Sequence, residues 1–410
     1  MLASLAMSTP ADRVERPRMH PNVVWLGITS LFTDVSTEML VPVLPLFVTL
    51  TLGASVTSLG VIEGAAESAA SLLRLTSGWW SDRVGKRKPF LVVGYGLSTA
   101  AKGVFAFAAT WPTVLGLRLA DRLGKGLRNP PRDALIADSV PAGQRGRAFG
   151  LHRTLDTTGA AIGPLVAFFM LSRWPHDYRR IFAATVIPGV LSVLVLLFLV
   201  RSVARSAKAP HARDEGVTPL GVPFRRFVIA DTLFQLGNSS LAFVLLRAKT
   251  GGLAEALVPL AYVLSNVVHA ALALPIGALS DRLGRRRLLL ASYVLYAAIY
   301  ALLAWSGAPA VTVGALALYG LFNALNEGTG KALVADLVPA DRRGTAFGIQ
   351  NTAAGLALLP ASALAGWLWD QRGPSTAFAV DAALALAAAV LFTVLLPSRR
   401  EHEERHGAAA

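Results

Sequence analysis

Long apolar segments follow one another along almost the whole chain, and each is about as long as a bilayer is thick. A helix needs about twenty apolar residues to cross the hydrocarbon core of a membrane. About twelve segments come close to that length, and they run over 23–47, 59–80, 89–109, 111–138, 148–171, 180–200, 224–246, 255–279, 288–306, 309–337, 345–369 and 375–396. The pattern predicts an all-α integral membrane protein with twelve transmembrane helices.

The composition also indicates a membrane protein. Hydrophobic residues make up 54% of the chain and charged residues 16%, and the mean hydropathy is +0.52. A soluble domain of this composition would carry apolar surface that it could not bury. We therefore expect the lipid bilayer to be the solvent and a partner of the chain.

The net charge of +14 does not indicate a nucleic-acid partner. Lys and Arg lie in short loops between apolar segments rather than on one polar face. The chain has no cysteine and its seven histidines are scattered, so it lacks both disulfides and the ligand spacing of a metal site. We expect no metal and no other cofactor. The absence of a nucleophile–base set argues against catalytic residues and against an enzyme.

The basic residues predict how the chain crosses the membrane. They occur on alternate loops, on the same side as the N-terminus: Arg83, Lys86, Arg87, Lys88, Arg145, Arg147, Arg201, Arg205, Lys208, Arg213, Arg282, Arg285, Arg286, Arg287, Arg342, Arg343, Arg399 and Arg400. By the positive-inside rule this side is cytoplasmic, and both termini face it. Residues 1–22 do not resemble a cleaved signal peptide and are expected to form a cytoplasmic tail, as are residues 397–410.

The two halves of the chain resemble each other. The sequence Arg145–Gly150 returns as Arg343–Gly348. Six helices per repeat predict two parallel, pseudo-symmetric bundles, related by an axis along the membrane normal. The expected units are an N-terminal bundle over 23–200, a cytoplasmic linker over 201–223 and a C-terminal bundle over 224–396.

A short basic sequence motif, which we call the loop phrase, occurs once in each half, between the second and third segments of that half. The pattern is Gly, three residues, Asp-Arg, one residue, Gly and then basic residues. It is matched by Gly78, Asp82, Arg83, Gly85 and Arg87, and again by Gly277, Asp281, Arg282, Gly284 and Arg286. With these loops, the chain over about 23–396 resembles a twelve-helix transporter of the major facilitator superfamily. Trp80 stands where that family usually has Leu, and Leu279 fits the pattern.

The resemblance implies that the two loops act as gates. Each Asp-Arg pair lies where a helix reaches the cytoplasmic surface, and it can pair with charges on neighbouring helices while the transporter faces outward. Asp138 and Asp336, at the cytoplasmic ends of the fourth and tenth segments, are the expected partners. The alternative is that the basic loops only set the topology of the chain.

Charges inside the apolar segments are informative, because a charge at bilayer depth is costly unless it is paired or faces water. The fourth segment carries a stripe of bases on one helical sector: Arg118, Arg122, Lys125, Arg128 and Arg132. In the family this helix has an Arg followed four residues later by Gly, which Arg122 and Gly126 match. The resemblance makes Arg122 the expected link between protonation and substrate, and we expect Arg118, Arg122 and Lys125 to contact the substrate.

Carboxylates on the first two segments can face these bases. Asp34 and Glu38 lie one turn apart, as do Glu63 and Glu67. We expect a carboxylate of this group to change its proton occupancy as the cavity opens to either side, with Asp34 and Glu38 ranked first. Asp156 of the fifth segment is expected to pair with the bases. The alternative is that all of these are static buried ion pairs.

The fifth segment resembles the antiporter motif of the family's drug exporters. The residues that match are Gly150, Gly159, Gly163 and Pro164. In those exporters, small residues let helices 5 and 8 approach, and proline bends the backbone. The alternative is ordinary small-residue packing between helices.

Polar side chains of the second half are expected to contact the substrate from the other side of the cavity. They stand on otherwise apolar helices, as is usual in small-molecule sites: Asp231, Gln235, Asn238, Asn266, Asn323 and Glu327. The tenth segment has no counterpart to the stripe of bases in the fourth. We therefore expect coupling in the first half and recognition shared by both halves.

These features predict a monomeric, proton-coupled secondary transporter of the inner or plasma membrane that exports a small organic molecule in exchange for protons. The chain contains no GxxxxGK[ST] phosphate-binding loop, which argues against an ATPase. One alternative is a proton symporter that imports an anionic metabolite or a metal chelate. Another is a sensor or assembly protein without transport activity.

Overall fold

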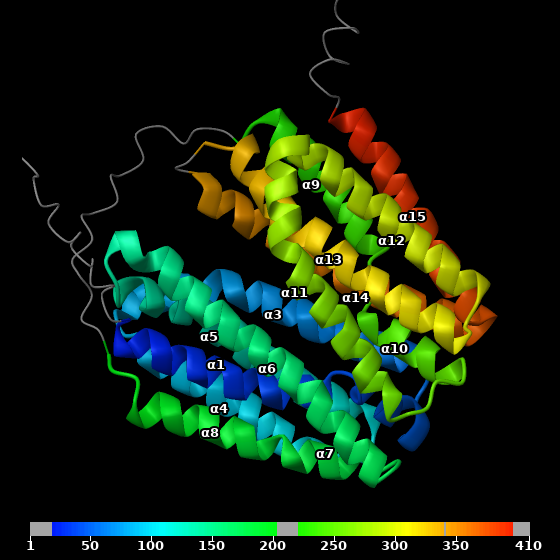
Figure 1. Cartoon of the computed structure of the whole chain (residues 1–410), viewed down its shortest axis with the longest axis horizontal. Coiled ribbons are helices and arrows are strands. Elements are labelled where there is room, and N and C mark those ends of the chain that lie inside the picture. Colours follow the sequence, from blue (N-terminus) through cyan, green and yellow to red (C-terminus); the bar gives the residue numbers. More distant parts are fainter. Residues whose placement is uncertain (1–18, 203–219, 340–341, 397–410) are drawn as a thin grey trace, which may run out of the picture.

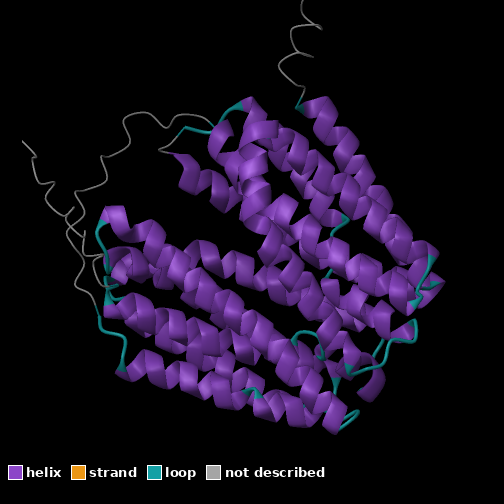
Figure 2. Cartoon of the chain, in the orientation of Figure 1, coloured by secondary structure: helices purple, strands orange, loops and turns teal. Residues whose placement is uncertain are grey.

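The computed structural model describes residues 19–202, 220–339 and 342–396. Within these ranges the regular elements are all helices (Figure 2). The expected tails and most of the expected linker fall on 1–18, 203–219 and 397–410, which lie outside the described residues.

The first half of the chain forms one bundle, drawn from blue to green in Figure 1. Its elements are α1 (Pro21–Leu40), α2 (Leu44–Leu46), a π-helical turn (Phe47–Thr51), α3 (Val56–Val84), α4 (Lys88–Phe105), α5 (Trp111–Asp138), a 3-10 turn (Ala142–Gln144), α6 (Arg145–Arg173), α7 (Tyr178–Ala184) and α8 (Val186–Phe198).

The second half forms another bundle, which lies beside the first (Figure 1). Its elements are α9 (Val222–Leu236), α10 (Leu241–Thr250), α11 (Leu257–Leu283), α12 (Arg285–Trp305), α13 (Pro309–Leu337), α14 (Arg343–Arg372) and α15 (Pro374–Leu395).

Each predicted segment corresponds to one helix or to a broken helix. The breaks follow α1, where Pro42 lacks the amide hydrogen that a helix needs, and occur at Thr185 and at residues 237–240. Nine stretches of the described residues are long and apolar enough to cross a membrane. The all-helical membrane fold is thus confirmed. The count of twelve crossings stays a prediction, because α3, α4 and α5 are more polar than the others.

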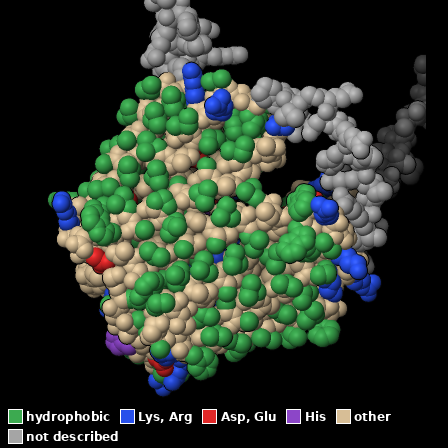
Figure 3. All heavy atoms as spheres, turned by 180° about the vertical axis from the view of Figure 1, so that it is seen from behind, with side chains coloured by type: hydrophobic (Ala, Val, Ile, Leu, Met, Phe, Trp, Pro, Cys, Tyr) green, Lys and Arg blue, Asp and Glu red, His purple; other side chains and the backbone are tan. Residues whose placement is uncertain are grey.

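The outer face of the protein is apolar, as a lipid-facing surface must be. Side chains such as Leu274, Trp305 and Phe107 are more than 80% exposed. Hydrophobic side chains are spread over the whole face in Figure 3, and most Lys and Arg side chains lie near its edges. Such a surface on a water-soluble monomer would cause association. The surface therefore agrees with a bilayer as the solvent.

The glycine that ends each repeated loop phrase has a backbone conformation that other residues rarely adopt. Gly85, at the end of α3, has φ +71°, and Gly284, at the end of α11, has φ +91°. A side chain would strain both positions. These glycines let the long helices stop and let the chain turn within a few residues, which places the basic residues of the loop at the end of the bundle. We call this end the basic-loop side and the opposite end the far side.

Two helices, α3 and α14, form a close seam between the bundles. A Cβ atom on Gly60 would lie 2.1 Å from the carbonyl oxygen of Ser362, and one on Gly64 would lie 2.7 Å from the Cα atom of Leu359. Ser68 donates a hydrogen bond of 2.5 Å to the carbonyl of Gly355. Backbones can approach this closely only where side chains are small, so the seam brings the two halves into direct contact.

Candidate functional site

The bases of α5 are held by carboxylates from neighbouring helices. Arg118 binds Glu63 of α3 through two hydrogen bonds, of 3.0 and 3.1 Å, and its third nitrogen lies 3.5 Å from Asp121. The Arg118 residue is only 1% exposed. The structure therefore places Arg118 in a sealed ion pair. This geometry does not favour the prediction that Arg118 contacts the substrate, because each guanidinium nitrogen faces a carboxylate and the residue is buried.

Lys102 completes this buried group, and the sequence reasoning missed it. It is 1% exposed, lies 3.7 Å from Asp121 and donates a hydrogen bond of 2.7 Å to Thr37. Asp121 also accepts a bond of 2.5 Å from Ser98. A lysine within the apolar segment 89–109 is itself the signal that could have revealed it.

Arg122 and Lys125 lie one turn further along α5 and are less deeply buried. The Arg122 side chain lies 3.8 Å from Glu67 and is 11% exposed, and that of Glu67 is 32% exposed. Glu67 also pairs with Arg74 of its own helix. Lys125 is half-buried and acts electrostatically on Glu67, Asp34 and Glu38. This part of the stripe, unlike Arg118, is open to solvent or to a ligand.

Asp34 and Asp156 face each other between α1 and α6. Their carboxyl groups lie close enough to interact, and Asp156 accepts a hydrogen bond of 2.8 Å from Ser30. A Cβ atom on Gly159 would lie 3.1 Å from that of Asp34, so the missing side chain lets the helices come this close. Asp156 was expected to pair with the bases of α5. Arg132 of α5 acts on it electrostatically, and Arg153 of its own helix lies 3.4 Å from it.

Glu38 forms a contact that joins the two halves. Its Oε2 atom accepts a hydrogen bond of 2.7 Å from the hydroxyl of Tyr262 on α11. Asn266, one turn further along α11, lies close enough to interact with the same hydroxyl. The sequence predicted Glu38 and Asn266 as site residues on separate helices, and the structure brings them together through Tyr262.

Asp231, Gln235 and Asn238 cluster near the break between α9 and α10. Asp231 accepts hydrogen bonds from Tyr293 at 2.8 Å and from Gln350 at 3.2 Å. Asn238 donates one of 2.8 Å to Gln235. Asp231 is buried within the second bundle. It therefore holds neighbouring polar side chains in place and does not itself line the expected substrate cavity.

Glu327 lies at a cavity between the two halves, on the basic-loop side of Tyr262. It pairs with Lys331 at 3.0 Å and lies 3.6 Å from His269. The cavity has a volume of about 360 Å³ and is also lined by Arg153 of the first half. Asn323 is half-buried one turn before Glu327 on α13. Bases surround the one acid of this cavity.

Two glycines of α6 pack against α1. A Cβ atom on Gly159 would lie 2.4 Å from the carbonyl of Leu31, and one on Gly163 would lie 2.7 Å from that of Val35, both on α1. No atom lies within 4 Å of the corresponding position on Gly150. The expected approach of α6 to α11 through these glycines therefore stays a prediction. They bring α6 against α1, and Pro164 follows the second of them inside the helix.

The two loop phrases form ion-pair clusters with the expected aspartates, though not through every expected base. Arg87 lies 2.9 Å from Asp138 and 3.4 Å from Asp82. In the second half, the corresponding cluster is built by Arg285, which lies 2.5 Å from Asp336 and 3.5 Å from Asp281.

Two other bases of the loop phrases have different partners. Arg286 donates a bond of 3.4 Å to the carbonyl of Thr393. The guanidinium of Arg83 lies 5.3 Å from the ring centre of Trp79. Arg285 thus takes the place that the sequence had suggested for Arg286. In each of these four pairs, both residues belong to the same half.

Replacing Asp138 by asparagine tests the gating role of the first cluster. We expect turnover to slow about two- to fivefold, because the lost ion pair is partly exposed and contributes on the order of 1 kcal/mol. Membrane insertion and thermal stability should hardly change. Initial rates in proteoliposomes measure the effect. Asp177→Asn, which removes an exposed aspartate paired with Arg180 on the far side, is the control. Equal rates for Asp138→Asn and wild type would reduce the loop to a topological signal.

Comparisons with known proteins identify the family. The Major Facilitator Superfamily model matches residues 26–248 and 227–410. An uncharacterised MFS-type transporter of Methanocaldococcus jannaschii is 33% identical over 379 residues, covering 91% of this chain and 94% of that protein. An uncharacterised protein of Mycobacterium tuberculosis is 29% identical over 388 residues, covering 92% and 93%.

A solved structure, that of a D-xylose-proton symporter, has the same fold. It superimposes with a TM-score of 0.72 at 18% identity, covering 92% of this chain and 97% of that one. The long matches to the family model and to the archaeal relative settle the class of protein. The chain belongs to the major facilitator superfamily and is an integral membrane transporter of the cell membrane, not an enzyme.

Proposed function

We propose that this transporter exports a small organic molecule across the cytoplasmic membrane in exchange for protons, with Asp34 and Asp156 as the central proton-carrying pair. The observation that carries the proposal is that α6 packs directly against Asp34 at Gly159 and brings Asp156 close enough for the two carboxyl groups to interact. Two carboxyl groups can share a hydrogen bond only if one of them holds a proton, because a carboxylate has no hydrogen to donate.

The charged groups around this pair allow its protonation state to change during transport. Asp34 is half-buried, with Glu38 one turn away and Lys125 near both carboxylates. Neighbouring carboxylates disfavour the state in which both members of the pair are ionised, whereas the nearby Lys125 favours ionisation. The balance between them changes when the halves move and water reaches the pair from the other side. This is the coupling that a secondary transporter requires.

The orientation in the proposal follows the basic loops. With the basic-loop side in the cytoplasm, the cavity beside Glu327 lies on the cytoplasmic side. Hydrogen bonds that join the halves lie on the far side, where Asp370 binds Val56 and Glu255 binds the amide of His176. We infer that the structure represents the inward-facing state, with the outer side closed.

The direction of transport rests on less specific features. The Gly150, Gly159, Gly163 and Pro164 spacing resembles that of drug exporters and favours export. Import in symport with protons is the second candidate, and it is favoured by the bases Arg153, His269 and Lys331 around the cavity. These bases would attract an organic anion, and a structural neighbour is a proton symporter of D-xylose.

Replacing Asp34 by asparagine tests the proton pair. The amide keeps the size of the side chain and still hydrogen-bonds Asp156, but it cannot release a proton. We expect proton-coupled flux to fall at least tenfold, with normal insertion and unfolding temperature. The readout is a pH-sensitive dye in proteoliposomes, with substrates found by comparing cellular accumulation of cationic drugs, organic acids and metal chelates.

Asp133→Asn is the control for this experiment, because Asp133 lies in the same half and its side chain is half-exposed beside Arg132. Normal proton-coupled flux in Asp34→Asn would contradict the assignment. Accumulation lowered only by the wild type establishes export. Accumulation raised only by the wild type establishes import and overturns the antiport direction.

A further inference from the structure

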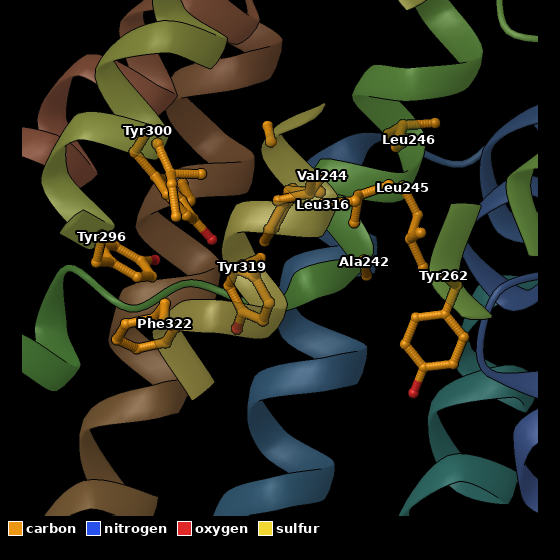
Figure 4. Close-up of a cluster of buried hydrophobic side chains, with 14 of the residues drawn as sticks. Ala242, Val244, Leu245, Leu246, Tyr262, Tyr296, Tyr300, Leu316, Tyr319 and Phe322 are labelled. Atoms are coloured by element: carbon orange, nitrogen blue, oxygen red, sulfur yellow. The ribbon is translucent and has the colours of Figure 1, made fainter. Parts of the chain in front are cut away.

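Tyr262 of the second half lies at the interface between the halves and contacts Glu38 of the first half. The residue is buried on α11, and its ring lies apart from the aromatic cluster of Tyr296, Tyr319 and Phe322 (Figure 4). The hydroxyl reaches across to the first half and donates its hydrogen to Glu38 over 2.7 Å. Asn266 lies one turn away on α11 and interacts with the same hydroxyl.

Glu38 is packed closely by a neighbouring helix on the side opposite this hydrogen bond. A Cβ atom on Gly163 would lie 2.8 Å from that of Glu38, so α6 packs tightly against it from behind. The charged groups that act on Glu38 are Asp34 on its own helix and Arg122 and Lys125 on α5. From the second half, the group that faces it is the hydroxyl of Tyr262.

We propose that Tyr262 is a positioning residue that links the proton occupancy of Glu38 to the conformation of the transporter. This inference rests on the proposed proton-coupled function. A hydrogen bond donated to a carboxylate favours its ionised form. The bond crosses the interface between the halves, so it exists in this state and breaks when the halves rock apart around α11 and α1.

The sequence of events follows from which state holds the bond. When the outer side opens, Tyr262 leaves Glu38, and the carboxylate takes up a proton from outside. When the halves return to the present arrangement, the Tyr262 hydroxyl approaches again, and the proton leaves Glu38 for the cytoplasmic side. Tyr262 keeps its own proton throughout, so one proton crosses for each cycle of Glu38.

Tyr262→Phe removes only the hydroxyl and tests the proposal. Proton release at the inner side becomes harder, so we expect the dependence of flux on internal pH to shift upward by about one to two pH units, the effect of one hydrogen bond to a charged group. The matched control is Tyr319→Phe. Tyr319 is a buried tyrosine of α13 packed against Tyr296 and Phe322 of its own half, and its loss should leave the profile unchanged.

A double variant decides whether the effect passes through Glu38. In a Glu38→Gln background, the flux that the Asp34–Asp156 pair still supports should show no further shift when Tyr262→Phe is added. Asn266→Ala, which removes the second partner of the hydroxyl, should shift the profile in the same direction by less.

Different results would contradict the role of Tyr262 and the proposed function. A Tyr262→Phe profile identical to that of the wild type would overturn the inference, as would a shift that persists in Glu38→Gln. Absence of any proton-coupled flux in the wild type would instead overturn the proposed function, and this inference with it.

Discussion

Replacing Arg118 by alanine is expected to destabilise the protein by about 3–5 kcal/mol, the usual result of removing one partner of a buried ion pair. Arg118 is 1% exposed and holds Glu63 by two hydrogen bonds while lying 3.5 Å from Asp121. Without it, two carboxylates remain in the interior of the bundle with less positive charge nearby. Thermal unfolding in detergent, followed by the fluorescence of the eight tryptophans, measures the loss.

Two further variants define the cause of this destabilisation. Arg118→Lys keeps the charge but not the two-pronged geometry, so its unfolding temperature should fall between those of wild type and Arg118→Ala. Arg180→Ala, which removes a half-exposed base on the far side, should unfold like the wild type. If Arg118→Ala unfolds within one degree of the wild type, the ion pair adds little, and Arg118 becomes a candidate for substrate contact again.

Replacing Asp370 by alanine is expected to shift the transporter toward the state that is open on the far side. Asp370 of α14 caps the first turn of α3: its carboxylate accepts hydrogen bonds from the amides of Val56 at 3.0 Å and Thr57 at 2.7 Å, and from the Thr57 hydroxyl at 2.5 Å. A cap of this kind contributes about 1–2 kcal/mol. Because this cap joins the two halves, its loss should change the ratio of the states about 5- to 30-fold.

Thiol labelling measures this shift directly, because the chain has no cysteine of its own. Ser68→Cys places a reporter in the closed seam against Gly355, and Ala273→Cys places one in the cavity beside Glu327. With Asp370→Ala, a membrane-impermeant maleimide should react faster at position 68 and slower at 273.

The control for the labelling is Asp177→Ala. Asp177 also caps a helix on the far side, α7, through the amide of Arg180, but both residues belong to the same half. Its loss should not change either labelling rate. Equal effects of the two substitutions would show that the Asp370 cap stabilises α3 locally and does not hold the halves together.

Much of the architecture could be predicted from the sequence. Apolar segments of bilayer length determined where the helices lie, and the repeated loop phrase determined that two similar halves exist and where their long helices end. These properties depend on residues close together in the chain. Hydropathy and helical period are sums over neighbouring residues, and Gly85 and Gly284 act on their own backbone. The sequence also showed which helices carry charges and which helical sector those charges share, because both properties depend only on residues close together in the chain.

Only the tertiary structure decided which of these groups meet. Helical periodicity shows that Asp34 and Glu38 share a face, but not that α6 and α11 cover it and supply Asp156 and Tyr262. The same holds for Gly159 and Gly163, whose missing side chains accommodate α1 rather than α11. Partners from distant parts of the chain depend on how the helices pack around one another, and many pairings of such helices satisfy the same apolar pattern equally well.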